Sequence, residues 1–166
     1  MTVPNYITFL RIIFIPLVLA LLLLNLNGLA AILFMLLSFS DALDGYLARR
    51  LKQVSDLGKF LDPIADKILV ISVLIALVGF GKANSIAVII MVAREFLVSG
   101  IRIRAAQGNK IIAAIPLAKL KTFTQIIAVL MLILNVPLAN TILWLAVLLS
   151  LASGGAYLWL SRILKP

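Results

Sequence analysis

Acidic side chains are concentrated in one short segment of the chain. Five of its six acidic residues fall within Ser40–Lys67, in the string SDALDGYLARRLKQVSDLGKFLDPIADK. Asp41 and Asp44 are three positions apart, and Asp62 and Asp66 are four apart. Residues at these separations share one face of a helix. If two antiparallel neighbouring helices carry the two pairs, four carboxylates converge on one point, and the spacing predicts a site there.

Converging carboxylates repel one another, so positive charge must compensate them. The chain contains no histidine and no cysteine, which excludes Cys/His zinc sites, thiolate nucleophiles and imidazole acid–base chemistry. Oxygen ligands favour hard divalent cations, Mg²⁺ or Mn²⁺. Four carboxylates suffice for two such ions about 3.5–4 Å apart, a separation that clamps a phosphoryl group between them.

Small residues accompany the acids. Gly45 and Ala48 lie on or beside the first acidic face and Gly58 lies on the second, so a ligand has room against the helix backbone. The alternative is a solvated helix–turn–helix with ordinary surface acids. It is disfavoured because each carboxylate at membrane depth costs roughly 2.5–3.5 kcal/mol on insertion scales.

Composition indicates that this segment lies in a membrane protein. The 166 residues are 64% hydrophobic, whereas a soluble domain is nearer half apolar and this length cannot bury the excess. A soluble helical bundle is the disfavoured alternative. The formal charge of +9 favours an anionic leaflet or an anionic substrate over nucleic acid, since no basic stretch is interleaved with aromatic residues.

The elements that must position the acids are six apolar helices, each close to the length needed to cross a bilayer. The breaks between them contain Gly, Pro and Asn, as in NLNG, GFGKANS and NVPLAN. The third helix begins close to Phe60 or bends at Pro63, and Ile111–Lys121 runs along the membrane surface before the fifth turns inward. The predicted spans are Tyr6–Leu24, Leu29–Ala48, Phe60–Gly79, Ser85–Arg104, Leu120–Leu134 and Leu138–Leu160.

Basic residues then predict the orientation. The breaks after the first, third and fifth helices contain a single basic residue between them, Lys82. The other breaks and the C-terminal tail are rich in Lys and Arg. By the positive-inside rule, both termini and the acidic segment face the cytoplasm. We therefore expect a single domain over residues 1–166: an all-α integral membrane protein with six transmembrane helices and its active site at the cytoplasmic side of the bundle.

The acidic segment resembles the signature of a known family. DALDGYLARRLKQVSDLGKFLDPIAD is similar to D-x2-D-G-x2-A-R-x8-G-x3-D-x3-D of the CDP-alcohol phosphotransferase family, with all eight defined positions present. Members are integral membrane enzymes with six transmembrane helices, usually homodimers. They use an alcohol and divalent metal to displace CMP from a CDP-linked donor.

The resemblance implies roles for individual residues. Asp41, Asp44, Asp62 and Asp66 would hold two Mg²⁺ or Mn²⁺ ions, and Asp66 would also deprotonate the acceptor hydroxyl. The donor nucleotide site would be lined by Asp44, Gly45, Ala48, Arg49 and Gly58.

The start of the chain resembles a second family segment. PNYITFLRI is similar to P-N-x-[IL]-T-x2-R of phosphatidylglycerophosphate synthases and nearby subfamilies, and Asn5, Thr8 and Arg11 follow three-residue steps on one helical face. The similarity assigns Asn5 and Thr8 to the donor site. The alternative is a helix N-cap followed by an Arg11 that snorkels to the interface.

Cations in the second half of the chain suggest a pocket for a phosphate on the acceptor. Arg94 falls about halfway along the fourth predicted helix, where ionisable residues are functional candidates. Arg102, Lys119 and Lys121 lie nearer the cytoplasm and join it in the predicted acceptor-phosphate site. The alternatives are an Arg94–Glu95 pair that holds helices together and, for the other cations, topology and lipid contact.

The strings AREFLVSGIR and KLKTFTQ resemble the glycerol-phosphate subfamily, although Ala118 stands where that subfamily usually has glycine. The resemblance implies transfer of a phosphatidyl group from CDP-diacylglycerol to sn-glycerol 3-phosphate, giving phosphatidylglycerol phosphate and CMP. Inositol phosphate, serine or another phospholipid remain alternative acceptors. A cation or proton carrier and a structural membrane protein are the non-enzyme alternatives.

Overall fold

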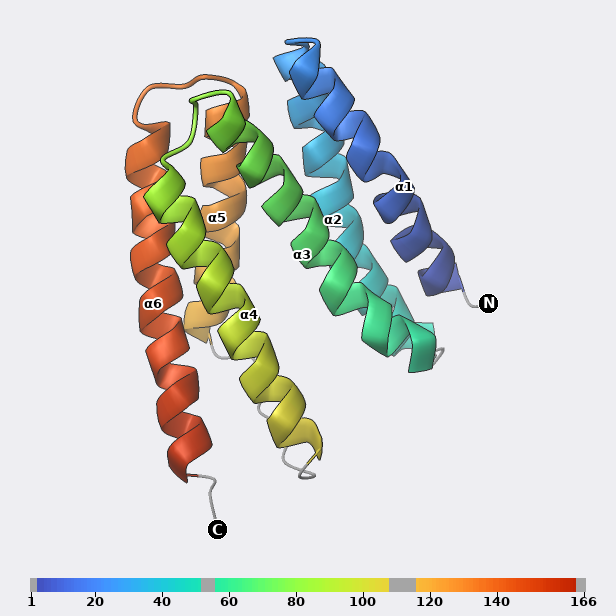
Figure 1. Ribbon diagram of the computed structural model, residues 1–166. Coiled ribbons are helices and arrows are strands. Elements are labelled where there is room, and N and C mark those ends of the chain that lie inside the picture. The colour runs from blue at the N-terminus through green and yellow to red at the C-terminus, as the bar shows by residue number, and fades with distance from the viewer. Residues whose placement is uncertain (1–2, 52–55, 108–115, 164–166) are drawn as a thin grey trace.

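The chain forms a bundle of six long helices in a computed structural model that describes residues 3–51, 56–107 and 116–163, with side chains described over 10–40, 67–101, 103–104 and 116–159 (Figure 1). Successive helices run in opposite directions, so three connections lie at one end, which we call the loop end, and both termini lie at the other. This confirms the predicted all-α class within the described residues. The helices are α1 (Val3–Leu23), α2 (Asn27–Leu51), α3 (Asp56–Gly79), α4 (Ser85–Gln107), α5 (Pro116–Ile133) and α6 (Ala139–Ile163).

Two helix starts refine the predicted boundaries. α3 begins at Asp56 rather than near Phe60, so Pro63 lies about two turns inside the helix. α5 begins at Pro116, where a proline is well tolerated because the first helical N–H has no intrahelical partner. The predicted surface run falls partly on residues 111–115, which lie outside the described residues.

The three turns at the loop end share one capping geometry. Asn25, Gly81 and Asn135 have positive φ angles of 57°, 70° and 54°. Around each, two backbone N–H groups bond back to carbonyls three and five residues earlier, as in Leu26 N to Leu21 O at 2.9 Å. This is the Schellman arrangement, which glycine and asparagine favour because they tolerate the left-handed conformation.

Side-chain amides connect these turns to one another. Asn140 donates to the Lys82 carbonyl at 3.0 Å and accepts from the Asn84 N–H at 2.9 Å. Asn84 caps α4 by accepting from Ala87 N at 3.1 Å, and the Lys82 ammonium donates to Asn27 Oδ1 at 3.1 Å. The loop end is thus held by short, mostly neutral hydrogen bonds.

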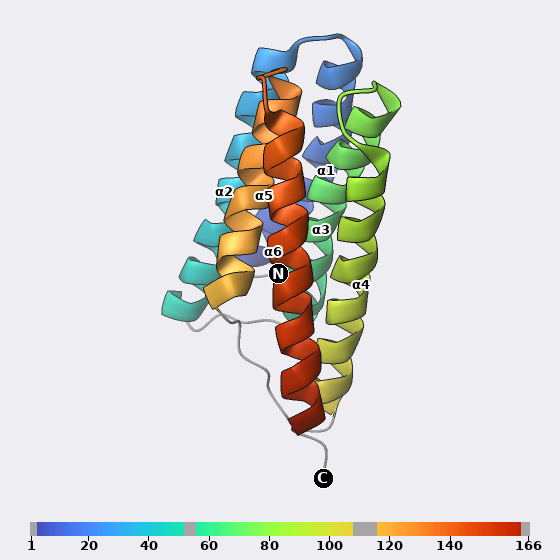
Figure 2. The ribbon, with the colours of Figure 1, turned by 90° about the vertical axis from the view of Figure 1, so that its left-hand side faces the viewer.

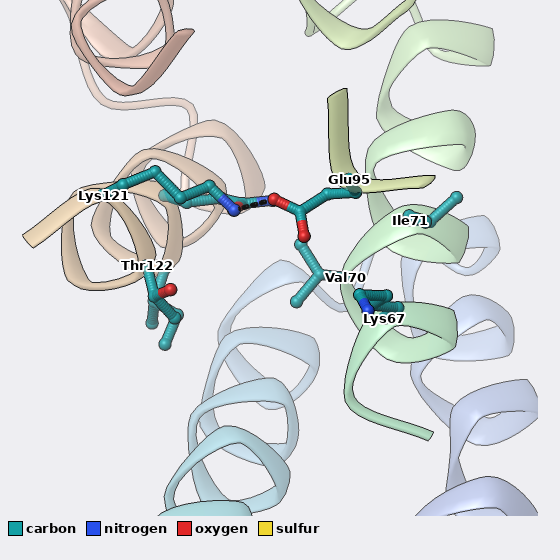
Figure 3. A pocket seen from close by; sticks show the side chains of 8 residues that line it. Lys67, Val70, Ile71, Glu95, Lys121 and Thr122 are labelled. Carbon is teal, nitrogen blue, oxygen red and sulfur yellow. Dashed lines mark hydrogen bonds and ion pairs between the residues drawn. The ribbon is translucent and has the colours of Figure 1, made fainter. Parts of the chain in front are cut away.

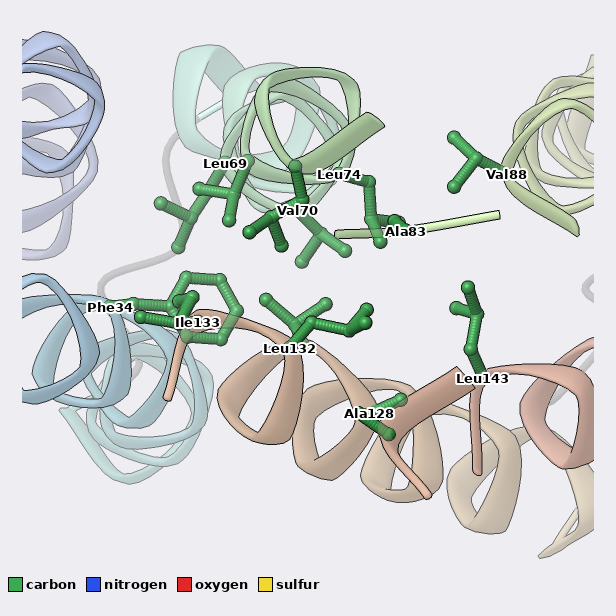
Figure 4. Close-up of a cluster of buried hydrophobic side chains, with 14 of the residues drawn as sticks. Phe34, Leu69, Val70, Leu74, Ala83, Val88, Ala128, Leu132, Ile133 and Leu143 are labelled. Atoms are coloured by element: carbon green, nitrogen blue, oxygen red, sulfur yellow. The ribbon is translucent and has the colours of Figure 1, made fainter. Parts of the chain in front are cut away.

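Helix α5 contacts helices from both halves of the bundle, α1–α3 and α4–α6. It packs closely along α6 and also contacts α2 and α3, while α1 packs against α2 and α3, and α4 against α6 (Figures 1 and 2). Figure 4 shows the shared core, in which Phe34 of α2, Leu69 and Leu74 of α3, Leu132 of α5 and Leu143 of α6 converge. All five side chains are buried, so the same core holds both halves.

Large apolar side chains also cover the outside of the bundle, including Ile13, Leu97 and Leu148. In the part of the chain that the structure describes, Pro116–Ile133 and Ala139–Trp159 are long and apolar enough to cross a membrane. The outer surface of the bundle thus presents many large apolar side chains, and extensive exposed apolar surface marks sites that contact a membrane or another protein.

Candidate active site

The four aspartates of the acidic segment lie on two helices. Asp41 and Asp44 belong to the last turns of α2, and Asp62 and Asp66 to the first half of α3. These parts of α2 and α3 lie toward the end of the bundle that carries the termini (Figure 1). The helical spacing of each pair is therefore confirmed at the level of the backbone. Their side chains lie outside the described residues, and the described ones include no group of three acids able to hold a metal.

A polar pocket lies where α3, α4 and α5 meet (Figure 3). One face of each helix contributes to it, because the lining residues of α3 and α5 recur at three- and four-residue steps. Basic, acidic and amide side chains are therefore gathered inside an otherwise apolar bundle. The polar pocket is lined by Lys67, Val70 and Ile71 of α3, Glu95 of α4, and Lys121, Thr122, Gln125 and Ile126 of α5.

Glu95 is the acidic centre of this pocket. Its Oε1 accepts hydrogen bonds from the Lys121 ammonium and, at 3.1 Å, from Arg94 Nη1 (Figure 3 draws the first). The Lys121 side chain is only 5% exposed and that of Glu95 14%. Because a lone charge at this depth would be costly, each ion depends on its partner.

Arg94 ties this centre to α6. Its Nε donates to the Ser150 carbonyl at 2.8 Å and its Nη2 to Ser153 Oγ at 2.6 Å. Gly154 allows this close approach, since a Cβ atom there would lie 3.3 Å from Arg94 Nε. With Nη1 on Glu95, all three guanidinium nitrogens have protein partners.

Lys67 approaches the pocket from α3. Its ammonium donates to Ser99 Oγ at 2.5 Å, and the Ser99 hydroxyl in turn donates to the Glu95 carbonyl at 2.6 Å. Glu95 and Ser99 are one turn apart on α4, so the two contacts share a helical face. Lys67 is half-buried, and it is the residue immediately after Asp66.

The structure separates the cations that the sequence grouped as an acceptor-phosphate site. Lys121 lines the polar pocket, whereas Lys119 is exposed and does not line it. Arg94 is 8% exposed and its contacts match the alternative of a charge pair that holds helices together. The side chain of Arg102 lies outside the described residues. The acceptor roles of these residues remain predictions.

The predicted donor site lies where side chains are not described. Its residues are therefore placed by helix alone: Asn5 and Thr8 on α1, Asp44, Gly45, Ala48 and Arg49 on α2, and Gly58 on α3. Arg11 is described, and its side chain is among the largest that are fully buried, at 1% exposed. A snorkelling arginine would keep its head group outside the protein. That alternative for Arg11 is therefore wrong.

Lys67 is the pocket residue that sequence reasoning missed. The signal was available, because Lys67 directly follows the acidic motif and precedes the apolar run from Ile68 to Gly79. A lysine at such a junction is more often a topology signal, and nothing local distinguishes the two roles. Its partner Ser99 is 32 residues away in sequence.

Comparison with known proteins identifies relatives over most of the chain. A protein of Bacillus subtilis (strain 168) named CDP-diacylglycerol–glycerol-3-phosphate 3-phosphatidyltransferase is 45% identical over 135 residues, which cover 76% of this chain and 70% of the relative. A protein of the same name from Rickettsia typhi is 41% identical over 167 residues, covering 93% of each chain.

A family model gives the same result. The model described as CDP-alcohol phosphatidyltransferase matches residues 1–152. This range contains the acidic segment, Lys67 and the linked residues Arg94, Glu95 and Lys121. Together with the similarity to the named relatives, this match covers far more than the acidic motif alone. The chain therefore belongs to the CDP-alcohol phosphatidyltransferase family.

Proposed function

We propose that this enzyme transfers the phosphatidyl group of CDP-diacylglycerol to sn-glycerol 3-phosphate, releasing CMP and forming phosphatidylglycerol phosphate. The observation that carries the proposal is 39–41% identity over nearly the full chain to relatives whose name states this pair of substrates. The polar pocket supports it, because Lys67 and Lys121 offer positive charge to an acceptor that itself carries a phosphate.

The aspartates fit a divalent-metal centre by the chemistry of their donor atoms. Asp41, Asp44, Asp62 and Asp66 provide only oxygen, from two helices that both end or begin at the same side of the bundle. They would hold two Mg²⁺ or Mn²⁺ ions, which when bound offset charge on the donor pyrophosphate and lower the pKa of an acceptor hydroxyl.

The residues of the chain then divide the reaction between them. Asp66 removes the proton of the acceptor hydroxyl, and the oxygen attacks the phosphorus that carries the diacylglycerol. The bond between this phosphorus and the CMP oxygen breaks, and CMP leaves with the electron pair. Arg49 is proposed to stabilise the charge that develops on the leaving phosphate. Asn5, Thr8, Gly45, Ala48 and Gly58 accommodate the nucleotide.

The proposed acceptor site combines the pocket with the predicted cations. Lys121 is placed in the pocket, and Arg94, Arg102 and Lys119 are proposed to add positive charge at or around it. The Glu95 contact orients the Lys121 ammonium. A carboxylate or an uncharged alcohol would form fewer or weaker charge-assisted hydrogen bonds with these cations than a phosphate monoester does.

The membrane arrangement is proposed on the same basis. All six helices cross the cytoplasmic membrane as a single domain over residues 1–166, with both termini and the aspartates on the cytoplasmic side. The apolar outer surface and the two long apolar stretches support this arrangement. The aspartate-bearing parts of α2 and α3 also lie toward the end of the bundle opposite the loop end. The enzyme is proposed to act as a homodimer, by the family resemblance.

An acceptor panel tests the function. The protein, purified in detergent with CDP-diacylglycerol and Mg²⁺ or Mn²⁺, is incubated with sn-glycerol 3-phosphate, inositol phosphate, serine or glycerol, and CMP release is measured. We expect CMP release with sn-glycerol 3-phosphate well above that with the other alcohols. CMP release with another alcohol and none with sn-glycerol 3-phosphate would show that the proposed acceptor is wrong.

A further inference from the structure

Lys67 occupies a position that connects the aspartate motif to the polar pocket. It is the next residue after Asp66 on α3, so the two Cα atoms are about 3.8 Å apart and the side chains leave the helix about 100° apart. The contact with Ser99 and the place of Lys67 in the pocket lining show that its face of α3 is turned to α4 and α5.

The charges around this position leave an excess of positive charge. Lys67, Lys121 and Arg94 surround one carboxylate, that of Glu95, which accepts from the latter two. Two lysines and one carboxylate line the pocket, so its described lining carries a formal charge of +1, and Arg94 bonds to Glu95 from outside this lining. A phosphate monoester carries close to two negative charges at neutral pH, so a lining of this sign attracts it.

We propose that Lys67 binds the phosphate of the acceptor, opposite Lys121, while Ser99 and Glu95 are positioning residues that hold the two ammonium groups. The inference rests on the proposed function and adds a residue to it. The acceptor is then proposed to place its hydroxyl at Asp66 and its phosphate at Lys67, the next residue of α3.

The donor pyrophosphate offers the same chemistry, and the structure favours the acceptor. The donor is proposed to bind between α2 and α3, at the helix faces that carry the aspartate pairs. Lys67 is bonded instead to α4, and α5 lines the other side of its pocket. A phosphate at Lys67 is therefore separate from one held by the aspartates.

Kinetics with both substrates test the assignment. In K67M we expect the KM for sn-glycerol 3-phosphate to rise about 10- to 100-fold, the usual effect of losing a hydrogen bond to a charged group. The KM for CDP-diacylglycerol should stay within about twofold, because Lys67 is not proposed to touch the donor. K67R should keep part of the affinity, and S99A should raise the acceptor KM by roughly threefold, since it only loosens the ammonium.

Lys82→Met is the matched control, because it removes a lysine at the opposite end of the bundle. It should leave both KM values unchanged. A rise in the CDP-diacylglycerol KM in K67M would assign Lys67 to the donor, and unchanged KM values for both substrates would rule out phosphate binding. Either result overturns the inference. Should K67M fail to fold, as judged by thermal unfolding, K67R and S99A still decide between these outcomes.

The wild type separates this inference from the proposed function. If it uses another phosphorylated alcohol in place of sn-glycerol 3-phosphate, the proposed acceptor is wrong, and the same KM comparison with that alcohol decides the role of Lys67. If it uses only alcohols without phosphate, both proposals are wrong.

Discussion

At the loop end of the bundle, asparagine amides and backbone groups hold neighbouring helix ends together, whereas in the polar pocket charged side chains from three helices meet around one carboxylate. Asn140, in the first turn of α6, bonds to Asn84 and Lys82 of the connection between α3 and α4, at 2.9 and 3.0 Å. Glu95 joins Lys121 of α5 to Arg94, which is itself bonded to α6.

The two regions differ in the polar groups that they contain: mainly neutral amides at the loop end and charged side chains in the polar pocket. At the loop end Asn27 and Asn84 accept hydrogen bonds from within the protein, and Asn140 both donates and accepts there. Among the described residues that line the polar pocket, two lysines face one carboxylate, and we propose that an anionic ligand adds the negative charge. Mutation at the loop end should therefore change stability alone, whereas mutation in the polar pocket should also change the KM for the acceptor.

Asp66→Asn should have the largest effect and should separate chemistry from folding. Loss of the proposed base lowers the rate of CMP release by about 10²- to 10⁴-fold. Thermal unfolding measured without divalent metal should change little. Asp56→Asn is the matched control, since Asp56 lies outside the acidic pattern, and it should retain activity. An active Asp66→Asn enzyme would contradict the proposed mechanism.

Glu95→Gln should come second, and it tests stability inside the polar pocket. Breaking a buried ion pair by removing one partner costs about 3–5 kcal/mol, so the free energy of unfolding should fall by this order. A titration with denaturing detergent measures it.

The double variant Glu95→Gln/Lys121→Met sharpens this result. With both charges of the pair gone, most of the stability should return, but the affinity for sn-glycerol 3-phosphate should not. A double variant as unstable as Glu95→Gln alone would show that the Lys121 contact is not the source of the loss.

Asn140→Ala should weaken the loop end without affecting catalysis. It removes two hydrogen bonds, and the free energy of unfolding should fall by about 1–2 kcal/mol. Asn140→Asp keeps the acceptor for the Asn84 N–H and should lose about half as much. Both KM values should match those of the wild type. A selective rise in the acceptor KM would show that the loop end also affects acceptor binding, against the prediction.

Gly154→Ala should give the smallest effect and tests how closely α6 supports Arg94. The new Cβ meets Arg94 at 3.3 Å, whereas the Cβ of Gly155→Ala meets nothing within 4 Å. Both changes gain helix propensity, so the difference between them isolates the contact, and Gly154→Ala should be about 1 kcal/mol the less stable. Equal melting temperatures would show that Arg94 shifts without cost.

The sequence by itself determined the features that depend on neighbouring residues. Six apolar runs predicted six helices, and the breaks rich in Asn and Gly became the turns at Asn25, Gly81 and Asn135. The spacing of the aspartates placed each pair on one helix. These features depend on residues a few positions apart, so local geometry decides them.

Only the tertiary structure decided which cations share the polar pocket. Lys119 and Lys121 are two positions apart and so lie on different faces of α5, yet the sequence offered no reason to choose the one that turns inward. Arg94 bonds to residues 56 and 59 positions away, and Lys67 to one 32 positions away. Such contacts form only when helix packing brings distant faces together, and no local periodicity records how those faces will meet.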